Sequence, residues 1–86
     1  MSEVIYGNLE REGLELVERG TKYFVRYDAG AHQVAWREDE LSSEEAKKLQ
    51  LGKPEEYEVI IALQARIEAT GLNPNIQNWS PTREST

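Results

Sequence analysis

The one histidine of the chain, His32, lies near several carboxylates in the sequence, and acid–base chemistry would be sought there first. A catalytic histidine needs a nucleophile and an orienting partner within hydrogen-bond reach. Asp28 and Tyr27 are close in sequence, but the only serine or threonine of the predicted hairpin, Thr21, lies at its opposite end. We therefore expect His32 to be a partly exposed turn residue without a catalytic role.

A metal site would have to combine His32 with Asp28, Glu38 or Asp39. One histidine with scattered carboxylates lacks the ligand spacing of zinc and related sites. The run "REDE" at 37–40 lacks the alternating oxygen ligands around a glycine that define a calcium loop. The chain has no cysteine, which excludes thiolate zinc sites, disulfides and a cysteine nucleophile. No catalytic residue, metal or cofactor is predicted, and we do not expect an enzyme.

A second group of side chains is suited to binding. Lys22, Arg26 and Arg37 are predicted to surround Phe24 on the polar face of a sheet, and cations around an exposed ring can bind a nucleic-acid base, a phosphate or an acidic protein surface. Trp79 could anchor the tail in a partner's groove. The alternative is that the N-terminal segment covers Phe24, the cations are solvated and Trp79 packs on its own domain. The candidate partner-binding residues are thus Lys22, Phe24, Arg26, Arg37 and Trp79.

Acidic residues gather at 38–40, 44–45 and 55–58. The last two clusters begin predicted helices, where the helix dipole accounts for them without a function. The same surface could also imitate phosphates and occupy a basic groove on a partner protein, since charge complementarity mainly raises association rate and specificity. Both interpretations stay open.

Sixteen acidic and ten basic residues give the 86-residue chain a net charge of −6. Neither residues 1–41 nor residues 42–86 are net basic, so nucleic acid is not the expected partner. The first residues lack the basic and apolar regions of a signal peptide, and no apolar run approaches a membrane span. We expect a cytoplasmic protein without a membrane segment.

The elements that position these residues begin with three runs rich in β-branched and aromatic residues, at 13–18, 22–28 and 32–38. The turn signals "ERGT" and "DAGA" separate them, which predicts a three-stranded antiparallel meander. Residues 1–12 could form either a helix or an edge strand.

Two pairings, Glu18 opposite Thr21 and Tyr27 opposite His32, give the sheet one apolar and one mostly polar face. Loops of the form "ERG" and "DAG" favour a glycine bulge that would shift the pairing by one, but the face pattern is the stronger constraint. The predicted apolar face, with His32 at its rim, carries Leu14, Leu16, Tyr23, Val25, Tyr27, Val34 and Trp36. The predicted polar face carries Glu15, Val17, Lys22, Phe24, Arg26, Gln33, Ala35 and Arg37.

Two helices follow in the pattern. Ser42 and Glu45 form a capping box for a helix at about 43–50, and Gly52 is expected to stop it. Pro54 is suited to the first position of a longer helix that ends at Gly71. The helical stripe expected to cover the sheet consists of Ile60, Leu63 and Ile67, widened by Tyr57 and Val59.

The predicted fold class is α+β: a three-stranded antiparallel β-meander followed by a short and a long α-helix packed on one sheet face. Residues 1–72 form one domain, and residues 73–86 an extended, partly mobile tail. We expect a small acidic non-enzymatic interaction module that binds a protein partner. A small homodimeric structural protein and a weak nucleic-acid-binding protein using the basic and aromatic sheet face are the alternatives.

Overall fold

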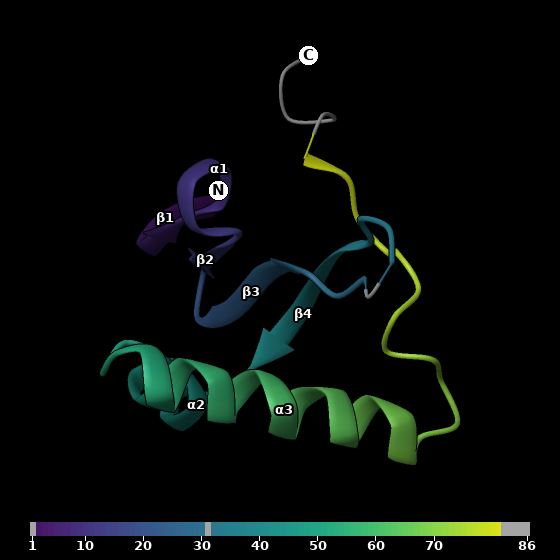
Figure 1. Ribbon diagram of the computed structural model, residues 1–86. Coiled ribbons are helices and arrows are strands. Elements are labelled where there is room, and N and C mark those ends of the chain that lie inside the picture. The colour runs from purple at the N-terminus through teal and green to yellow at the C-terminus, as the bar shows by residue number, and fades with distance from the viewer. Residues whose placement is uncertain (1, 31, 82–86) are drawn as a thin grey trace.

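The computed structural model describes residues 2–30 and 32–81. Four antiparallel strands form one sheet in the order β1-β2-β3-β4, and two helices pack on one of its faces (Figure 1). The fold is α+β, as predicted, with one strand more than expected. The elements are β1 (Ser2–Asn8), α1 (Leu9–Glu12), β2 (Leu14–Arg19), β3 (Lys22–Asp28), β4 (Trp36–Leu41), α2 (Ser43–Leu49) and α3 (Lys53–Ala69).

The N-terminal residues form both of the structures left open by the sequence, a strand and then one helical turn. β1 pairs with β2 and is interrupted by a bulge between Val4 and Tyr6. Gly7 has a φ of 80°, and a Cβ there would lie 2.6 Å from the carbonyl oxygen of Leu14, so only glycine fits. Asn8 then caps α1 by accepting a hydrogen bond from the amide of Arg11.

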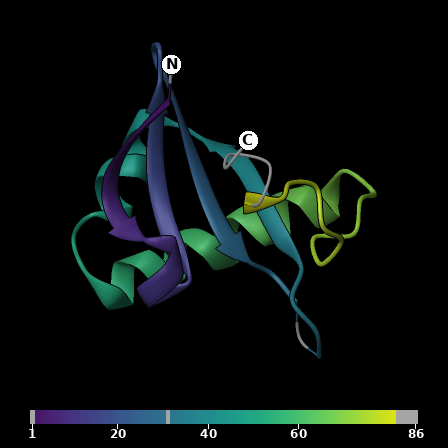
Figure 2. The same cartoon turned by 90° about the horizontal axis from the view of Figure 1, so that it is seen from above.

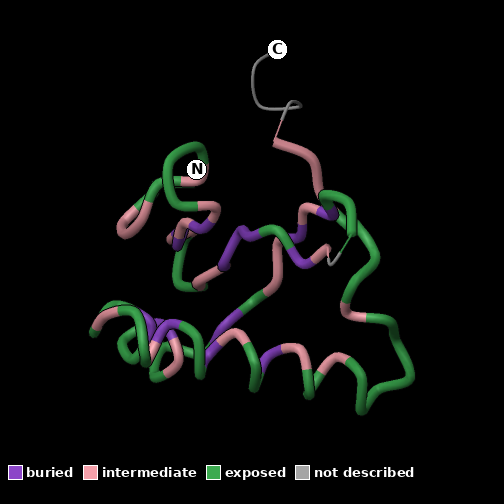
Figure 3. Tube along the Cα trace, viewed as in Figure 1, coloured by how far each residue is buried: buried purple, intermediate pink, exposed green. Residues whose placement is uncertain are grey.

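The pairing of β2 with β3 differs from the predicted register by two residues. Leu16 lies opposite Val25 and Leu14 opposite Tyr27, because the turn consists of Gly20 and Thr21. An even shift leaves every side chain on its predicted face. The apolar face of these two strands is therefore confirmed, and most of it is buried under the helices (Figure 3).

The predicted third strand was wrong in both bounds and register. β4 begins at Trp36, and Tyr27 lies opposite Arg37 instead of His32. This shift is odd, so it inverts the faces of the strand. Trp36 lies on the face away from the helices, Arg37 turns toward them, and Val34 is exposed in the loop.

The loop before β4 explains the error. The Asp28 carboxylate accepts hydrogen bonds from the amides of Gly30 and Ala35, both at 2.9 Å, and the amide of Ala29 donates to the carbonyl of Ala35. The residues expected to start the strand are thus held in a loop by a side chain. His32 is exposed in this loop.

The helices follow the sequence more closely. The capping box of Ser42 and Glu45 is confirmed at the start of α2, although α2 ends before Gly52, with Gln50 as its C-cap. Pro54 occupies the second position of α3 and not the first, because the helix begins at Lys53.

The buried stripe of α3 differs from the predicted one by a single position. Val59 and Leu63 are buried, and Ile60 and Ile67 pack against the core. Tyr57 is 69% exposed, so its predicted place under the sheet was wrong. Glu56 is buried instead. The core cluster comprises Leu14, Leu16, Val25, Tyr27, Ala29, Leu41, Ala46, Leu49, Val59 and Leu63.

After α3 the chain returns along β4 to the face of the sheet that the helices leave open (Figures 1 and 2). We call that face the outer face. The last residues of the predicted tail, 82–86, lie outside the described residues. In the part of the chain that is described, no helix combines the length and apolar character needed to cross a membrane.

Candidate protein-interaction site

Four charged residues on the outer face form one network, the outer-face cluster: Glu15, Arg19, Arg26 and Glu38. Arg26 donates from Nε to Glu38 Oε2 at 2.9 Å and from Nη1 to Glu15 Oε2 at 3.1 Å. Arg19 donates from Nη1 and Nη2 to the two oxygens of Glu38, at 3.2 and 2.8 Å. The two positive charges are therefore matched by two carboxylates of the same chain.

The cluster changes the titration of its central carboxylate. Burial alone would raise the pKa of Glu38, but the hydrogen bonds and positive charges of Arg19 and Arg26 outweigh burial. The pKa of Glu38 consequently lies below its ordinary value, so the charged form persists into acid.

Three of the five predicted binding residues meet at this cluster. The Arg26 guanidinium lies 4.5 Å from the ring centre of Trp79, and that of Arg19 lies 4.4 Å from the ring centre of Phe24. Arg26 is only 6% exposed, and Phe24 is partly buried. Lys22 is exposed at the start of β3, where it lies opposite Arg19 in the pairing of β2 with β3. The rings of Phe24 and Trp79 therefore pack on arginines of the same chain.

Arg37, the fifth predicted residue, is not part of the outer face. Its Nε and Nη2 donate to the two oxygens of Asp39, both at 2.8 Å, and its Nη1 donates to the carbonyl of Ile76 at 2.6 Å. Tyr27 donates to the same carboxylate, and burial followed by Asp39 raises the pKa of Tyr27 to about 12. Arg37 therefore joins the tail to the sheet and is buried in doing so.

The tail segment, residues 75–79, covers the outer edge of β4. Gln77 Oε1 accepts from the amide of Trp36, and the amide of Asn78 donates to the carbonyl of Trp36 at 3.1 Å. The Asn78 side chain accepts from the amide of Glu38 at 2.8 Å and donates to its carbonyl at 3.3 Å. The tail thus pairs with the edge much as another strand would. This arrangement agrees with Trp79 packing on its own domain.

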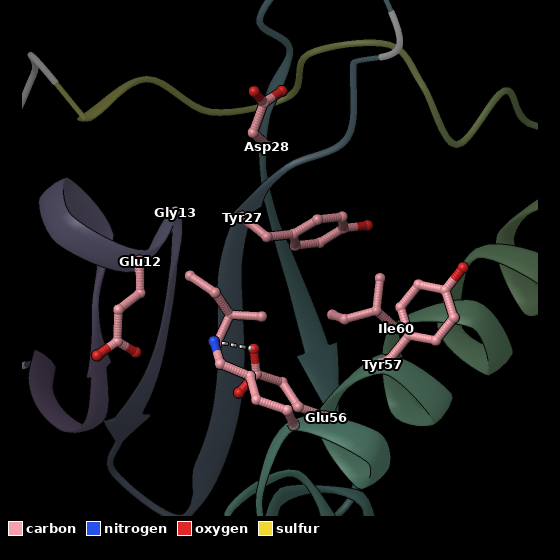
Figure 4. A pocket seen from close by; sticks show the side chains of 9 residues that line it. Glu12, Gly13, Tyr27, Asp28, Glu56, Tyr57 and Ile60 are labelled. Carbon is pink, nitrogen blue, oxygen red and sulfur yellow. Dashed lines mark ion pairs between the residues drawn. The ribbon is translucent and has the colours of Figure 1, made fainter.

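A second surface, absent from the sequence-based prediction, lies between the first turns of α3 and the sheet (Figure 4). We call it the α3 groove; its volume is about 390 Å³. Its walls are mainly apolar, and the exposed ring of Tyr57 stands at its rim. The lining residues are Glu12, Gly13, Leu14, Tyr27, Asp28, Lys53, Glu56, Tyr57 and Ile60.

Carboxylates make the surroundings of the groove negative. Glu56 is 8% exposed and accepts a hydrogen bond from the Tyr6 hydroxyl at 3.1 Å. Its other oxygen lies 3.6 Å from the ammonium of Lys53. The pKa of Tyr6 is raised by burial first, and then by Glu56 and Glu12. Two carboxylates from different elements therefore act on this corner of the molecule.

Comparisons of this chain with protein-family models, with curated proteins and with solved structures find no match. The two surfaces are therefore compared by their exposure and charge. The charged side chains of the outer-face cluster pair with one another, and Trp79 packs on Arg26. The α3 groove is open to solvent and carries the exposed ring of Tyr57.

The structure also places the residues that the sequence offered for metal binding and acid–base chemistry. Within residues 2–30 and 32–81, no three histidine or carboxylate side chains gather closely enough to hold a metal ion. His32 is exposed in the loop before β4, and the nearby carboxylate of Asp28 is engaged by backbone amides. The sequence could not reveal the groove, because its walls come from α1, β2, β3 and α3, which are far apart along the chain.

Proposed function

We propose that this protein is a non-enzymatic interaction module that binds a protein partner through the α3 groove. The observation that supports it is an apolar groove with a 69% exposed tyrosine, Tyr57, at its rim. Tyrosine is enriched among the residues that dominate binding energy, because its large ring is rigid and its hydroxyl tolerates water. A volume of about 390 Å³ is suited to one or two inserted side chains.

The geometry gives less support to the nucleic-acid alternative. It required Lys22, Arg26 and Arg37 to present positive charge beside Phe24. Arg26 is paired with Glu15 and Glu38, and Arg37 is turned to the other face. Phosphate binding depends on accessible cations, so the outer face offers little of the required charge.

The homodimer alternative is favoured by one observation, the difference between the two sheet edges. The tail segment covers β4, but among the residues that the structure describes no hydrogen bond from another segment reaches the outer edge of β1. An exposed edge strand can pair with a second copy. The bulge in β1 opposes such pairing, so this function stays second.

The test of the proposed function is affinity capture from a lysate of the source organism, with the partner identified and then purified. We compare the wild type with Tyr57→Ser, and use Leu72→Ser as the matched control. Leu72 is 64% exposed and does not line the groove. Binding should weaken at least about tenfold in Tyr57→Ser, about 1.4 kcal/mol, and stay unchanged in the control. Equal binding by all three proteins would refute the groove as the site.

A further inference from the structure

We propose that the α3 groove receives an arginine side chain of the partner, so that the partner is a protein with an accessible basic segment. This inference rests on the proposed function and specifies the chemistry of the ligand. Three features of the groove support it: its charge, the state of Glu56, and its aromatic walls.

The charge of the lining is the first feature. Three carboxylates, Glu12, Asp28 and Glu56, line the groove, and Lys53 is the one cation among the lining residues. Figure 4 shows Glu12 on the side of α1 and Glu56 on the side of α3, with the ring of Tyr27 between those elements. One oxygen of Asp28 already accepts hydrogen bonds from the amides of Gly30 and Ala35. A positive group entering the groove would meet carboxylates on two sides.

The state of Glu56 is the second feature. The Tyr6 hydroxyl engages Oε2 and fixes the carboxylate, which is almost fully buried. Among the described residues, the partner of Oε1 is the ammonium of Lys53, and their 3.6 Å separation exceeds the roughly 2.7–2.9 Å typical of a charge-assisted hydrogen bond, by about 0.7 Å or more. The Lys53 side chain is 73% exposed, so it holds its place weakly. Glu56 therefore retains acceptor capacity for a closer cation.

The aromatic walls are the third feature and favour arginine over lysine. The stem of an arginine can pack on Leu14 and Ile60 while its planar guanidinium stacks on the exposed ring of Tyr57. The planar fork can also make two hydrogen bonds to one carboxylate, which a lysine ammonium cannot. The chain already uses this chemistry on its outer face, where Arg26 lies between Trp79 and two carboxylates.

The net charge of −6 agrees with such a partner, because it attracts a basic segment over distances longer than a contact. Lys53 then acts as a competitor from the protein's own chain. Its removal should strengthen binding of an arginine, an effect that a purely structural role for Lys53 would not produce.

The experiment is an NMR titration of ¹⁵N-labelled full-length protein with N-acetyl-arginine methylamide. The uncharged isostere N-acetyl-citrulline methylamide and N-acetyl-lysine methylamide are the comparison probes. We expect saturable shifts of the amides of Gly13, Tyr57 and Ile60, with a dissociation constant on the order of millimolar. The citrulline probe should bind at least about tenfold more weakly, and the lysine probe should lie between the two.

Variants assign the effect to the groove. Glu56→Gln should weaken binding of the arginine probe at least about fivefold. Glu58→Gln is the matched control, because it removes the same charge two positions along α3 from an exposed residue outside the groove. Lys53→Met should strengthen binding about twofold or more.

The outcomes separate this inference from the proposed function. Equal binding of the citrulline and arginine probes, or no shift with either, overturns the arginine proposal. If Tyr57→Ser still loses the captured partner in that case, the groove remains the protein-binding site and the ligand chemistry is different. If partner capture is also unaffected by Tyr57→Ser, both proposals are refuted.

Discussion

Glu38 is the residue on which the outer face depends. It accepts hydrogen bonds from both Arg19 and Arg26, and Arg26 has almost no exposure to water that could replace this partner. A buried guanidinium that loses a carboxylate keeps the cost of its desolvation. The stability of this part of the sheet is therefore sensitive to a single charge.

We expect Glu38→Gln to lower the free energy of unfolding by about 2 kcal/mol at neutral pH. The measurement is urea denaturation followed by circular dichroism. Glu40→Gln is the control, since Glu40 lies on the same face of the same strand and is exposed; its effect should stay within about 0.5 kcal/mol. Equal effects of the two substitutions would contradict the role assigned to the cluster.

The pH dependence gives a second readout of the same substitution. The pKa of Glu38 in the folded protein lies below its ordinary value of 4.5, so its contribution is complete above pH 4.5 and is lost as the pH falls through the folded value. The difference in stability between wild type and Glu38→Gln should therefore be largest near pH 7 and shrink below pH 4. A difference that stays constant down to pH 3 would contradict this linkage.

At the scale of the elements, β4 and the tail segment depend on each other. The Asn78 side chain accepts a hydrogen bond from the amide of Glu38 and donates one to its carbonyl. The backbone amide of Asn78 donates to the carbonyl of Trp36. These contacts also place Trp79 over Arg26. Losing them would leave β4 as an open edge.

We expect Asn78→Ala to detach the tail segment at a cost of about 1 kcal/mol, because the freed backbone groups can bind water. Hydrogen exchange of the Glu38 amide should accelerate about tenfold, while that of the buried Val25 should change only in proportion to the lost stability. Asn73→Ala is the matched control, since the Asn73 side chain accepts from the amide of Asn75, within the same segment after α3, and no hydrogen bond joins it to β4 among the described residues. Unchanged exchange at Glu38 would show that Asn78 does not hold the edge.

The same elements show which parts of the fold could be predicted. β2, β3, α2 and α3 follow local signals: alternating apolar residues, a glycine turn, a capping box and a helical stripe. β4 depends on a tertiary feature, the loop held by Asp28, which no local pattern indicates. Arg37 and Asp39 of β4 point toward the helices and form an ion pair with each other. Polar residues thus occupy positions where a half-buried strand normally has apolar ones, so the apolar–polar alternation of the sequence indicates the wrong face.

The candidate site could be predicted less well than the fold, and for a similar reason. Phe24, Arg26 and Trp79 do come together, but the carboxylates of Glu15 and Glu38 that neutralise Arg26 only meet it in the folded sheet. The α3 groove arises from segments distant in sequence. The exposed ring of Tyr57 marks the groove, whereas the sequence pattern predicts Tyr57 on the buried stripe of α3. Glu56, one position earlier in the helix, is buried instead.

At the scale of the whole molecule, the two edges of the sheet differ. If β1 pairs with a second copy, light scattering should give twice the chain mass at high concentration, and Val4→Lys should restore the monomer, because an edge lysine opposes strand pairing. Val4 is exposed on β1, so the substitution leaves the core intact. A monomer at every concentration would remove the homodimer candidate.

The covering of β4 by residues 75–79 also sets an order of events during synthesis. The tail segment leaves the ribosome after the strand that it protects, and at about 5–20 residues per second the interval lasts roughly two to seven seconds. During this interval the outer edge of β4 lacks the hydrogen bonds that Gln77 and Asn78 supply in the folded protein. Emergence of the tail segment therefore completes the protection of the β4 edge.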